Sequence, residues 1–154
     1  MLQKRLTTTL LHAEKGAEVG ATSKKLSFDD LIKLYASVKP EYRSKGTWLM
    51  NDDTALFLRT MKDDSGAYLW NSDKDTILGK PVVIGEGMPN TESGKCPVLF
   101  GNFSYYWMIH RSPVRVRSLK EKFALHGQVG YLAMEFVDGR LMHREAVKAL
   151  KITA

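Results

Sequence analysis

The spacing of apolar residues changes near residue 66, and this change is what most limits the fold. Before it, two segments carry apolar residues at helical intervals. After it, apolar residues gather in short runs separated by glycine, proline and polar residues, a pattern typical of strands. The sequence therefore predicts an α+β chain in which two helices precede most of the strands.

The first predicted helix begins at Ser27, which can cap it, and Asp29 and Asp30 suit the positive end of its dipole. Lys39 is expected in its last turn, and Pro40 prevents its continuation. Its predicted apolar face consists of Phe28, Leu31, Ile32 and Tyr35.

A short buried strand at 47–50 is predicted to lead into the second helix. Residues 51–54, Asn-Asp-Asp-Thr, carry the capping signal, and 63–66 are expected to end the helix. Leu56, Phe57 and Met61 are its predicted apolar contacts.

Beyond the second helix, strands are predicted at 81–84, 98–100, 105–109 and 129–137. Val114 and Val116 alternate with Arg115 and Arg117, which is the two-residue period of a half-exposed strand. Asp138-Gly139 is a strong signal for a tight turn.

The two ends of the chain are less clear. Residues 1–26 form an irregular N-terminal segment by sequence, with Gly16 and residues 20–25 predicted as loop. Residues 141–152 favour helix by propensity, whereas Val147 and Ile152 also allow a strand.

Composition sets broad limits on function. The chain has 154 residues, a net charge of +6 and a pI of about 9.4, which permits an anionic partner without requiring one. Its single cysteine, Cys96, cannot form an internal disulfide. No apolar run approaches the roughly 18–20 residues of a membrane span. The N-terminal residues resemble a signal peptide only faintly, because threonines and His12 interrupt their apolar stretch.

The residues that usually carry catalysis form no recognisable set. Three carboxylate pairs, Asp29-Asp30, Asp52-Asp53 and Asp63-Asp64, lie at predicted helix ends or turns, where capping explains them. His12, His110, His126 and His143 lack the spacing of a zinc site. Gly79-Lys80, Gly94-Lys95 and Gly85-Glu86-Gly87 do not complete a phosphate-binding or dinucleotide-binding motif. The sequence thus predicts no catalytic, metal or cofactor site, and no enzyme.

One basic segment stands out. Its cationic residues are Arg111, Arg115, Arg117, Lys120 and Lys122. They form a candidate basic face that could follow phosphates, although the solvated face of a strand is the favoured interpretation. Tyr105, Tyr106 and Trp107 lie nearby, but their apolar neighbours favour a core position.

Six short motifs follow one another from Ser27 onward. They read SFDDLIKLY (27–35), TWLMND (47–52), KDDSGAYLW (62–70), TILGKPVV (76–83, followed by Met88-Pro89), VLFGNFSYY (98–106) and FVDGR (136–140). Each is weak alone, but the ordered set resembles the C-terminal part of tailed-bacteriophage major capsid proteins, over roughly residues 27–152.

This resemblance implies the phage major capsid protein fold. An axial domain, a small mixed sheet flanked by two helices, is expected at 27–108. Long strands of the peripheral domain are expected at 109–140, and a return strand into the axial domain at 141–154. The resemblance thereby favours strand over helix at 146–152.

The resemblance also implies a role for the loop at 86–95, which in such shells points toward the five-fold and six-fold axes. A solvated hairpin loop is the simpler interpretation, and both can hold. The candidate subunit-interface residues are Gly87, Met88, Pro89, Asn90, Thr91, Glu92, Ser93 and Gly94.

Some parts of the family pattern have no counterpart here. Its N-terminal arm, extended hairpin and spine helix do not fit before Ser27, so this chain is expected to be a truncated product, a proteolytic core or a decayed prophage gene. We expect that it cannot build a shell alone. Some relatives cross-link a hairpin lysine to an asparagine, but 125–128 reads Leu-His-Gly-Gln, so no covalent cross-link is predicted.

The expected function is therefore structural. The predicted partners are other capsid subunits in pentamers and hexamers, with a weak contact to packaged DNA and no membrane or small-molecule substrate. The expected location is the virion capsid, and the host cytoplasm before assembly. The alternatives are a small nucleic-acid-binding protein using 111–122, and a hydrolase built on Cys96 or a histidine.

Overall fold

The computed structural model describes residues 10–11, 16–62, 66–68, 70 and 74–154. The chain divides into two units. The first comprises Met1–Tyr106 and Arg140–Ala154, and the second comprises Trp107–Gly139. No helix in the described ranges is long and apolar enough to cross a membrane.

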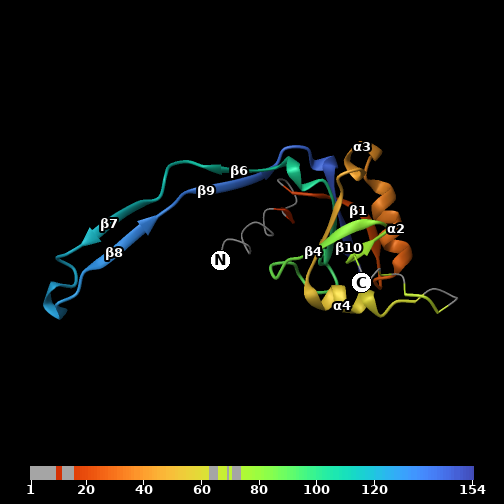
Figure 1. Ribbon diagram of the computed structural model, residues 1–154, viewed down its shortest axis with the longest axis horizontal. Coiled ribbons are helices and arrows are strands. Elements are labelled where there is room, and N and C mark those ends of the chain that lie inside the picture. Colours follow the sequence, from red (N-terminus) through yellow and green to blue (C-terminus); the bar gives the residue numbers. More distant parts are fainter. Residues whose placement is uncertain (1–9, 12–15, 63–65, 69, 71–73) are drawn as a thin grey trace. The chain divides into compact units, whose positions relative to one another are not determined.

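The first unit is built on a six-stranded sheet with helices packed against it (Figure 1). Its strand order is β1-β10-β5-β2-β4-β3. The strands are β1 Glu18–Ser23, β2 Thr47–Met50, β3 Thr76–Ile77, β4 Lys80–Ile84, β5 Val98–Gly101 and β10 Val147–Ile152. The helices are α2 Phe28–Ser37, α3 Pro40–Arg43 and α4 Asp52–Arg59. Both parallel and antiparallel pairs occur, which confirms the predicted α+β class with a mixed sheet.

Helix α2 begins where the sequence predicted. The Ser27 hydroxyl accepts a hydrogen bond from the Asp30 backbone N–H at 3.4 Å, and the Asp30 carboxylate accepts one from the Ser27 N–H at 3.2 Å. The helix ends at Ser37, so Lys39 lies outside its last turn and instead precedes α3 at the N-cap position, without a side-chain capping hydrogen bond. Pro40 occupies the first turn of α3, where its missing N–H costs nothing.

Helix α4 has the predicted cap but not the predicted apolar face. The Asn51 side chain accepts a hydrogen bond from the Thr54 N–H at 2.8 Å. Ala55 and Leu58 are buried, whereas Leu56 is 50% exposed and Phe57 is 41% exposed. The cap fixes where the helix starts, and the small Ala55 then lets this short helix approach the core closely. The helix ends at Arg59, and the predicted end signal at 63–65 lies outside the described residues.

The central strands are buried on both faces. Trp48 and Phe100 lie on one face, with ring centroids 4.3 Å apart, and pack with Leu31 and Leu34 of α2. Leu99, on the opposite face, packs in a second cluster with residues that include Met88, Leu141 and Val147. Because both faces are covered, β5 is a continuous apolar run without polar alternation.

Strand β1 corrects the prediction of a loop at 20–25. Residues 18–23 pair in parallel with β10 at the edge of the sheet. Gly20 is needed there for close packing, because a Cβ at this position would collide with the Ser37 hydroxyl and lie 2.8 Å from Lys148 Cβ. Strand β10 confirms the strand that the resemblance favoured at 146–152 over the local helix propensity.

The second unit, here called the arm (residues 107–139), consists of paired strands (Figure 1). Its strands are β6 Tyr106–His110, β7 Arg115–Leu119, β8 Gly130–Met134 and β9 Val137–Leu141. Strand β6 pairs with β9, and β7 pairs with β8 in antiparallel register. The chain reverses through the 3-10 turn Ala124–His126, followed by Gly127 at φ 64°.

One local prediction in the arm is wrong, and another holds only in part. Asp138 and Gly139 lie inside β9 and form no tight turn. The reversal at 120–128 leaves them in a strand whose pairing with β6 overrides the local signal. The strand predicted from the alternation of Val114 and Val116 with arginines is present as β7, but its valine face is not buried, because both valines are more than half exposed.

Candidate subunit-interface surfaces

The loop between β4 and β5 contains all of the predicted interface residues and is fixed at its base. Met88 is buried, and its N–H donates to the Gly85 carbonyl at 3.0 Å. The side-chain amide of Asn51 donates to the Asn90 side-chain oxygen. At the other end, the Gly94 N–H donates to the Ile152 carbonyl at 2.8 Å.

These anchors leave the middle of the loop, Thr91, Glu92 and Ser93, exposed. Asn51 serves two purposes, since the same side chain caps α4 and holds the loop. The sequence identified Asn51 only as a cap. An exposed tip on a fixed base can meet another surface without first being ordered, which lowers the entropy cost of contact.

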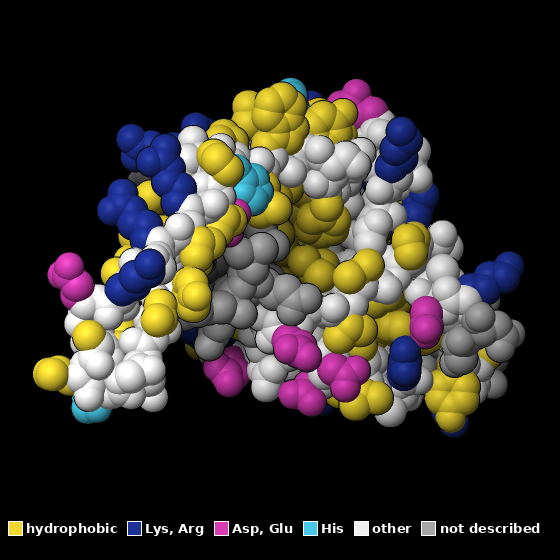
Figure 2. Space-filling model, turned by 60° about the vertical axis from the view of Figure 1, so that its left-hand side comes forward, with side chains coloured by type: hydrophobic (Ala, Val, Ile, Leu, Met, Phe, Trp, Pro, Cys, Tyr) yellow, Lys and Arg dark blue, Asp and Glu magenta, His cyan; other side chains and the backbone are white. Residues whose placement is uncertain are grey.

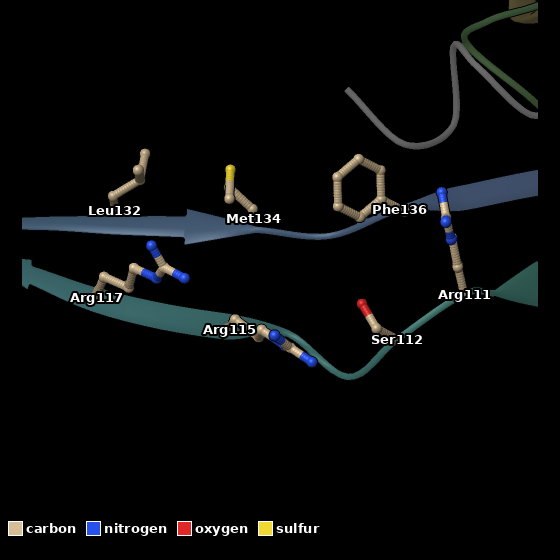
Figure 3. Close-up of a pocket in the computed structure, with 7 residues that line it drawn as sticks. All are labelled: Arg111, Ser112, Arg115, Arg117, Leu132, Met134 and Phe136. Atoms are coloured by element: carbon tan, nitrogen blue, oxygen red, sulfur yellow. The ribbon is translucent and has the colours of Figure 1, made fainter.

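Three of the five residues of the predicted basic face lie together on the arm. Arg111, Arg115 and Arg117 line a shallow pocket of about 290 Å³, whereas Lys120 and Lys122 lie in the turn that follows β7. Figure 3 shows the arginines on one side of this pocket and three apolar side chains, from β8 and the segment after it, on the other.

The apolar side of this pocket is the feature that sequence reasoning missed. Leu132, Met134 and Phe136 recur at the two-residue period of one strand face, which is a signal present in the sequence. Arg115 lies opposite Met134, and Arg117 lies opposite Leu132. Directly opposite residues project from the same face, so arginines and apolar side chains share one surface. We call it the arginine face; it consists of Arg111, Ser112, Arg115, Arg117, Leu132, Met134 and Phe136.

The other face of the arm has different chemistry. Val116 lies opposite Ala133, and Ser118 lies opposite Tyr131. His110 Nδ1 lies 2.8 Å from the Glu135 carboxylate. Among the β7–β8 pairs, the arginines therefore lie on one face, and uncharged side chains lie on the other.

Ion pairs join distant parts of the first unit. Lys148 Nζ donates to the Glu18 carboxylate at 2.5 Å, which ties β10 to β1. This hydrogen bond lowers the pKa of Glu18 below its ordinary value, although partial burial opposes the shift. Lys39 Nζ lies 2.7 Å from the Glu145 carboxylate, and the same pairing lowers the pKa of Glu145.

Among the described candidate catalytic residues, Cys96, His110 and His143 each have structural surroundings of their own. Burial raises the pKa of the Cys96 thiol, which disfavours the reactive thiolate. His143 packs edge-on against Tyr105, and His110 in the arm lies beside the Glu135 carboxylate. Over the described ranges no three potential metal ligands form a cluster. His12 and Asp63-Asp64 lie outside the described residues.

The described carboxylate pairs lie in the first turns of α2 and α4. Asp30 is the most buried of them. Burial alone would raise its pKa, but hydrogen bonds led by that from Ser27 outweigh burial and lower it. These carboxylates therefore have a structural explanation as helix caps.

Comparison with family models gives one clear match. The model of the phage capsid family matches residues 6–152. No curated protein matches the chain.

Solved structures with the same architecture include capsids of GTA particles and a virus-like particle. The capsid of an empty GTA particle is 26% identical with a TM-score of 0.76, and the match covers 97% of this chain and 56% of that one. A chain from Gordonia phage Cozz is 15% identical with a TM-score of 0.65, and the match covers 99% of this chain and 60% of that one. A virus-like particle from Pyrococcus furiosus is 15% identical with a TM-score of 0.61, and the match covers 97% of this chain and 62% of that one. The chain therefore spans little more than half the length of the solved proteins that it resembles.

Proposed function

The chain belongs to the phage capsid family, and from this premise we propose that it is a structural subunit of a bacteriophage or prophage head. Its work in this proposal is done by contacts between copies and not by catalysis. The observation that carries the proposal is the family match over residues 6–152. The division of the chain into a sheet-based unit and a two-stranded arm supports it.

Each unit has a proposed place in the shell. We assign residues 27–108 and the return strand within 141–154 to the axial domain, and residues 109–140 to the peripheral domain. The loop 86–95 is assigned to the centre of the five-fold and six-fold rings. Its fixed base and exposed tip support this assignment, because one loop must then fit two ring sizes.

The partners in this proposal are other capsid subunits, in pentamers and hexamers. The protein would be found in the virion capsid, and in the host cytoplasm before assembly. A weak contact with packaged DNA is assigned to Lys120 and Lys122, which lie exposed in the turn of the arm. Weak DNA binding that falls steeply with added salt is the expected behaviour of such a contact.

Ring formation by the purified chain tests the proposal. Native mass spectrometry and electron microscopy would be carried out over a rising concentration series, with far-UV circular dichroism to confirm folding. We expect mainly monomer when dilute and a growing fraction of five- or six-membered rings when concentrated, since ring contacts are heterologous. A folded chain that stays monomeric at millimolar concentration would overturn the proposal.

A matched pair of variants tests the loop. Ser93→Trp places a bulky side chain at the exposed loop tip, and Ser44→Trp places one at an exposed site after α3. We expect the first to abolish rings and the second to leave them unchanged. If rings still form with Ser93→Trp, the assignment of the loop to the ring centre is wrong.

A further inference from the structure

The carboxyl ends of β1, β10, β2 and β4 meet at one end of the sheet in the first unit. Strand β1 is parallel to β10, β2 is parallel to β4, and β5 runs antiparallel to both β10 and β2. The strands β1, β10, β2 and β4 therefore run in one direction, toward the loop 86–95 that follows β4. Helix α4 begins at this end as well, and Ala154 lies there (Figure 1). We call this end the tip; it comprises residues 24–26, 51–53, 85–95 and 152–154.

One side of the tip, after β1, is positively charged. Lys24 and Lys25 are exposed, and the ion pairs among the described residues include neither of them. With Phe57 of α4 they line a pocket of about 220 Å³, so an exposed aromatic ring lies close to the two lysine side chains. We call Lys24, Lys25 and Phe57 the cationic flank.

The charges nearest to this flank leave it positive. Asp29 in the first turn of α2 and Asp53, four residues before Phe57 on α4, are exposed carboxylates near it. Two exposed lysines on or beside β10, Lys95 and Lys151, balance the two aspartates. The positive charge of the cationic flank therefore remains.

The other side of the tip, after β2 and β4, is negatively charged. Asp52 opens α4, Glu86 follows β4, and both side chains are exposed. The ion pairs among the described residues include neither of them. Figure 2 shows acidic side chains gathered along the lower edge of the face in view. We call Asp52, Leu56 and Glu86 the anionic flank, because Leu56 lies about one helical turn beyond Asp52.

Helix α4 divides its exposed side chains between the two flanks. Asp52, Leu56 and Arg59 recur at spacings of four and three residues and so share one side of the helix. Arg59 lies 2.9 Å from the carboxylate of Asp75, the residue before β3, so this side faces the β4–β3 edge of the sheet. Phe57 lies on the other side, toward the end of β1. The helix dipole explains Asp52, but it does not explain the two large apolar side chains exposed on either side of the helix.

The two flanks are too far apart to neutralise each other within one copy. Neighbouring strands lie about 4.8 Å apart, so β1 and β4, four positions apart in the sheet, are separated by roughly 19 Å. That separation exceeds the Debye length of about 8 Å at physiological ionic strength. Because both strands run toward the tip, the end of β1 in one copy lies beside the end of β4 in the next when copies surround an axis. Opposite charges then face each other between neighbouring copies.

We propose that the cationic flank of one copy docks on the anionic flank of the next copy around the ring. The two lysines meet Asp52 and Glu86, while Phe57 and Leu56 cover each other and leave water. The contact is heterologous, because two different surfaces meet, and such contacts close into a ring when the rotation between copies allows it. The inference rests on the ring proposed above and adds which sides of neighbouring copies meet.

Zero-length crosslinking tests the contact directly. A carbodiimide joins a lysine amine to a carboxylate as an amide, with loss of water, only where the two groups touch. Isotopically labelled and unlabelled native chains are mixed at concentrations that form rings, so that mass spectrometry separates links between copies from links within one chain. We expect links from Lys24 or Lys25 to Asp52 or Glu86 of another copy. The proposal is overturned if these lysines link only to other carboxylates, only within one chain, or not at all.

Charge reversal tests the direction of the contact. Lys24→Glu with Lys25→Glu, or Asp52→Lys with Glu86→Lys, should each lower the fraction of chains in rings about five-fold or more, because like charges then meet. In a mixture, only contacts between unlike variants pair opposite charges, so the two variants must alternate around a ring. Alternation requires an even number of copies. We therefore expect mixing to restore six-membered rings with equal numbers of both variants, but not five-membered rings.

Two results of the mixing experiment would contradict the proposal, once circular dichroism has shown that both variants fold. One is the return of five-membered rings to the native level. The other is a mixture that regains neither six-membered rings nor carbodiimide links between positions 24–25 and 52 or 86. The crosslinking of the native chain decides the question independently of how the variants fold.

Lys120→Glu with Lys122→Glu is the matched control, because it changes the net charge equally but lies in the exposed turn of the arm. Its ring fraction should stay within about two-fold of that of the native chain. An equal loss in this control would assign the effect to net charge and reject the inference. Native rings without links between the two flanks would reject this inference but leave the shell role intact, whereas a folded chain that forms no rings would overturn both.

Discussion

Truncation of Trp48 tests whether the central sheet holds the first unit together. This side chain is fully buried, its ring centroid lies 4.3 Å from that of Phe100, and its Nε1–H donates to the Ile77 carbonyl at 3.0 Å. Replacing a buried tryptophan by alanine costs about 3–5 kcal/mol through lost burial and the cavity left behind. The variant also leaves the Ile77 carbonyl without its hydrogen-bond donor, which adds to the cost. We therefore expect the free energy of unfolding to fall by about 4 kcal/mol. For a unit of this size, that corresponds to a fall in Tm of roughly 12–16 °C.

The assay is urea unfolding followed by far-UV circular dichroism, which does not depend on tryptophan fluorescence. Trp107→Ala is the matched control, because Trp107 is 57% exposed and should change stability by less than about 1 kcal/mol. Trp48→Phe removes the hydrogen bond but keeps an aromatic ring, and should cost about 1–2 kcal/mol. A Trp48→Ala variant no less stable than Trp107→Ala would refute the account of the core.

Single contacts elsewhere in the first unit give three more predictions. Gly101→Ala should destabilise the first unit by about 2–3 kcal/mol in the same urea assay. A Cβ at this position would collide with the Ala146 carbonyl and lie 2.6 Å from Val147 Cα. An unchanged unfolding midpoint would contradict this packing. Ser27→Ala should cost about 1 kcal/mol by removing the cap of α2. Ser27→Thr keeps the hydroxyl that donates to the Asp30 carboxylate at 2.6 Å and should recover most of the loss. The pKa of Glu18 is lowered in the folded protein. The ionised carboxylate therefore stabilises the fold fully above its ordinary pKa of 4.5, and this contribution is lost as the pH falls through the lower pKa of the folded state. The Tm difference between the native chain and Glu18→Gln should therefore shrink as the pH falls below about 4.5, and a difference independent of pH would exclude the Glu18–Lys148 pair as its source.

Local chemistry in the sequence was sufficient to place α2, α4 and the central strands, although it did not predict the short helix α3. Ser27 and Asn51 begin the two helices because a side-chain oxygen satisfies backbone N–H groups that have no other partner. Residues 47–50 and 98–100 are apolar runs that only a sheet covered on both faces can bury.

What the sequence did not predict depends on partners distant along the chain. Strand β1 exists because β10 offers it an edge, and residues 18–23 carry no strand signal of their own. Asp138-Gly139 favours a turn locally, but pairing with β6 keeps it extended. The exposure of Leu56 and Phe57 could not be read from helical spacing, because the rotation of α4 is set by what it packs against.

The sequence predicted one candidate surface better than the other, again because pairing between distant segments decides which residues lie together. The loop 86–95 was recognisable from its glycine and proline content and from its place among the family motifs. Three arginines of the basic face do lie together, but their apolar neighbours come from β8 and beyond, and only the strand register joins the two sets.

The most direct test of the central claim is a cryo-electron microscopy reconstruction of particles that contain this chain. The account predicts an icosahedral shell with the loop 86–95 lining the five-fold and six-fold axes and the arm at the periphery of each ring. A reconstruction with this loop away from every symmetry axis, or particles in which the chain is not a regular part of the shell, would contradict it.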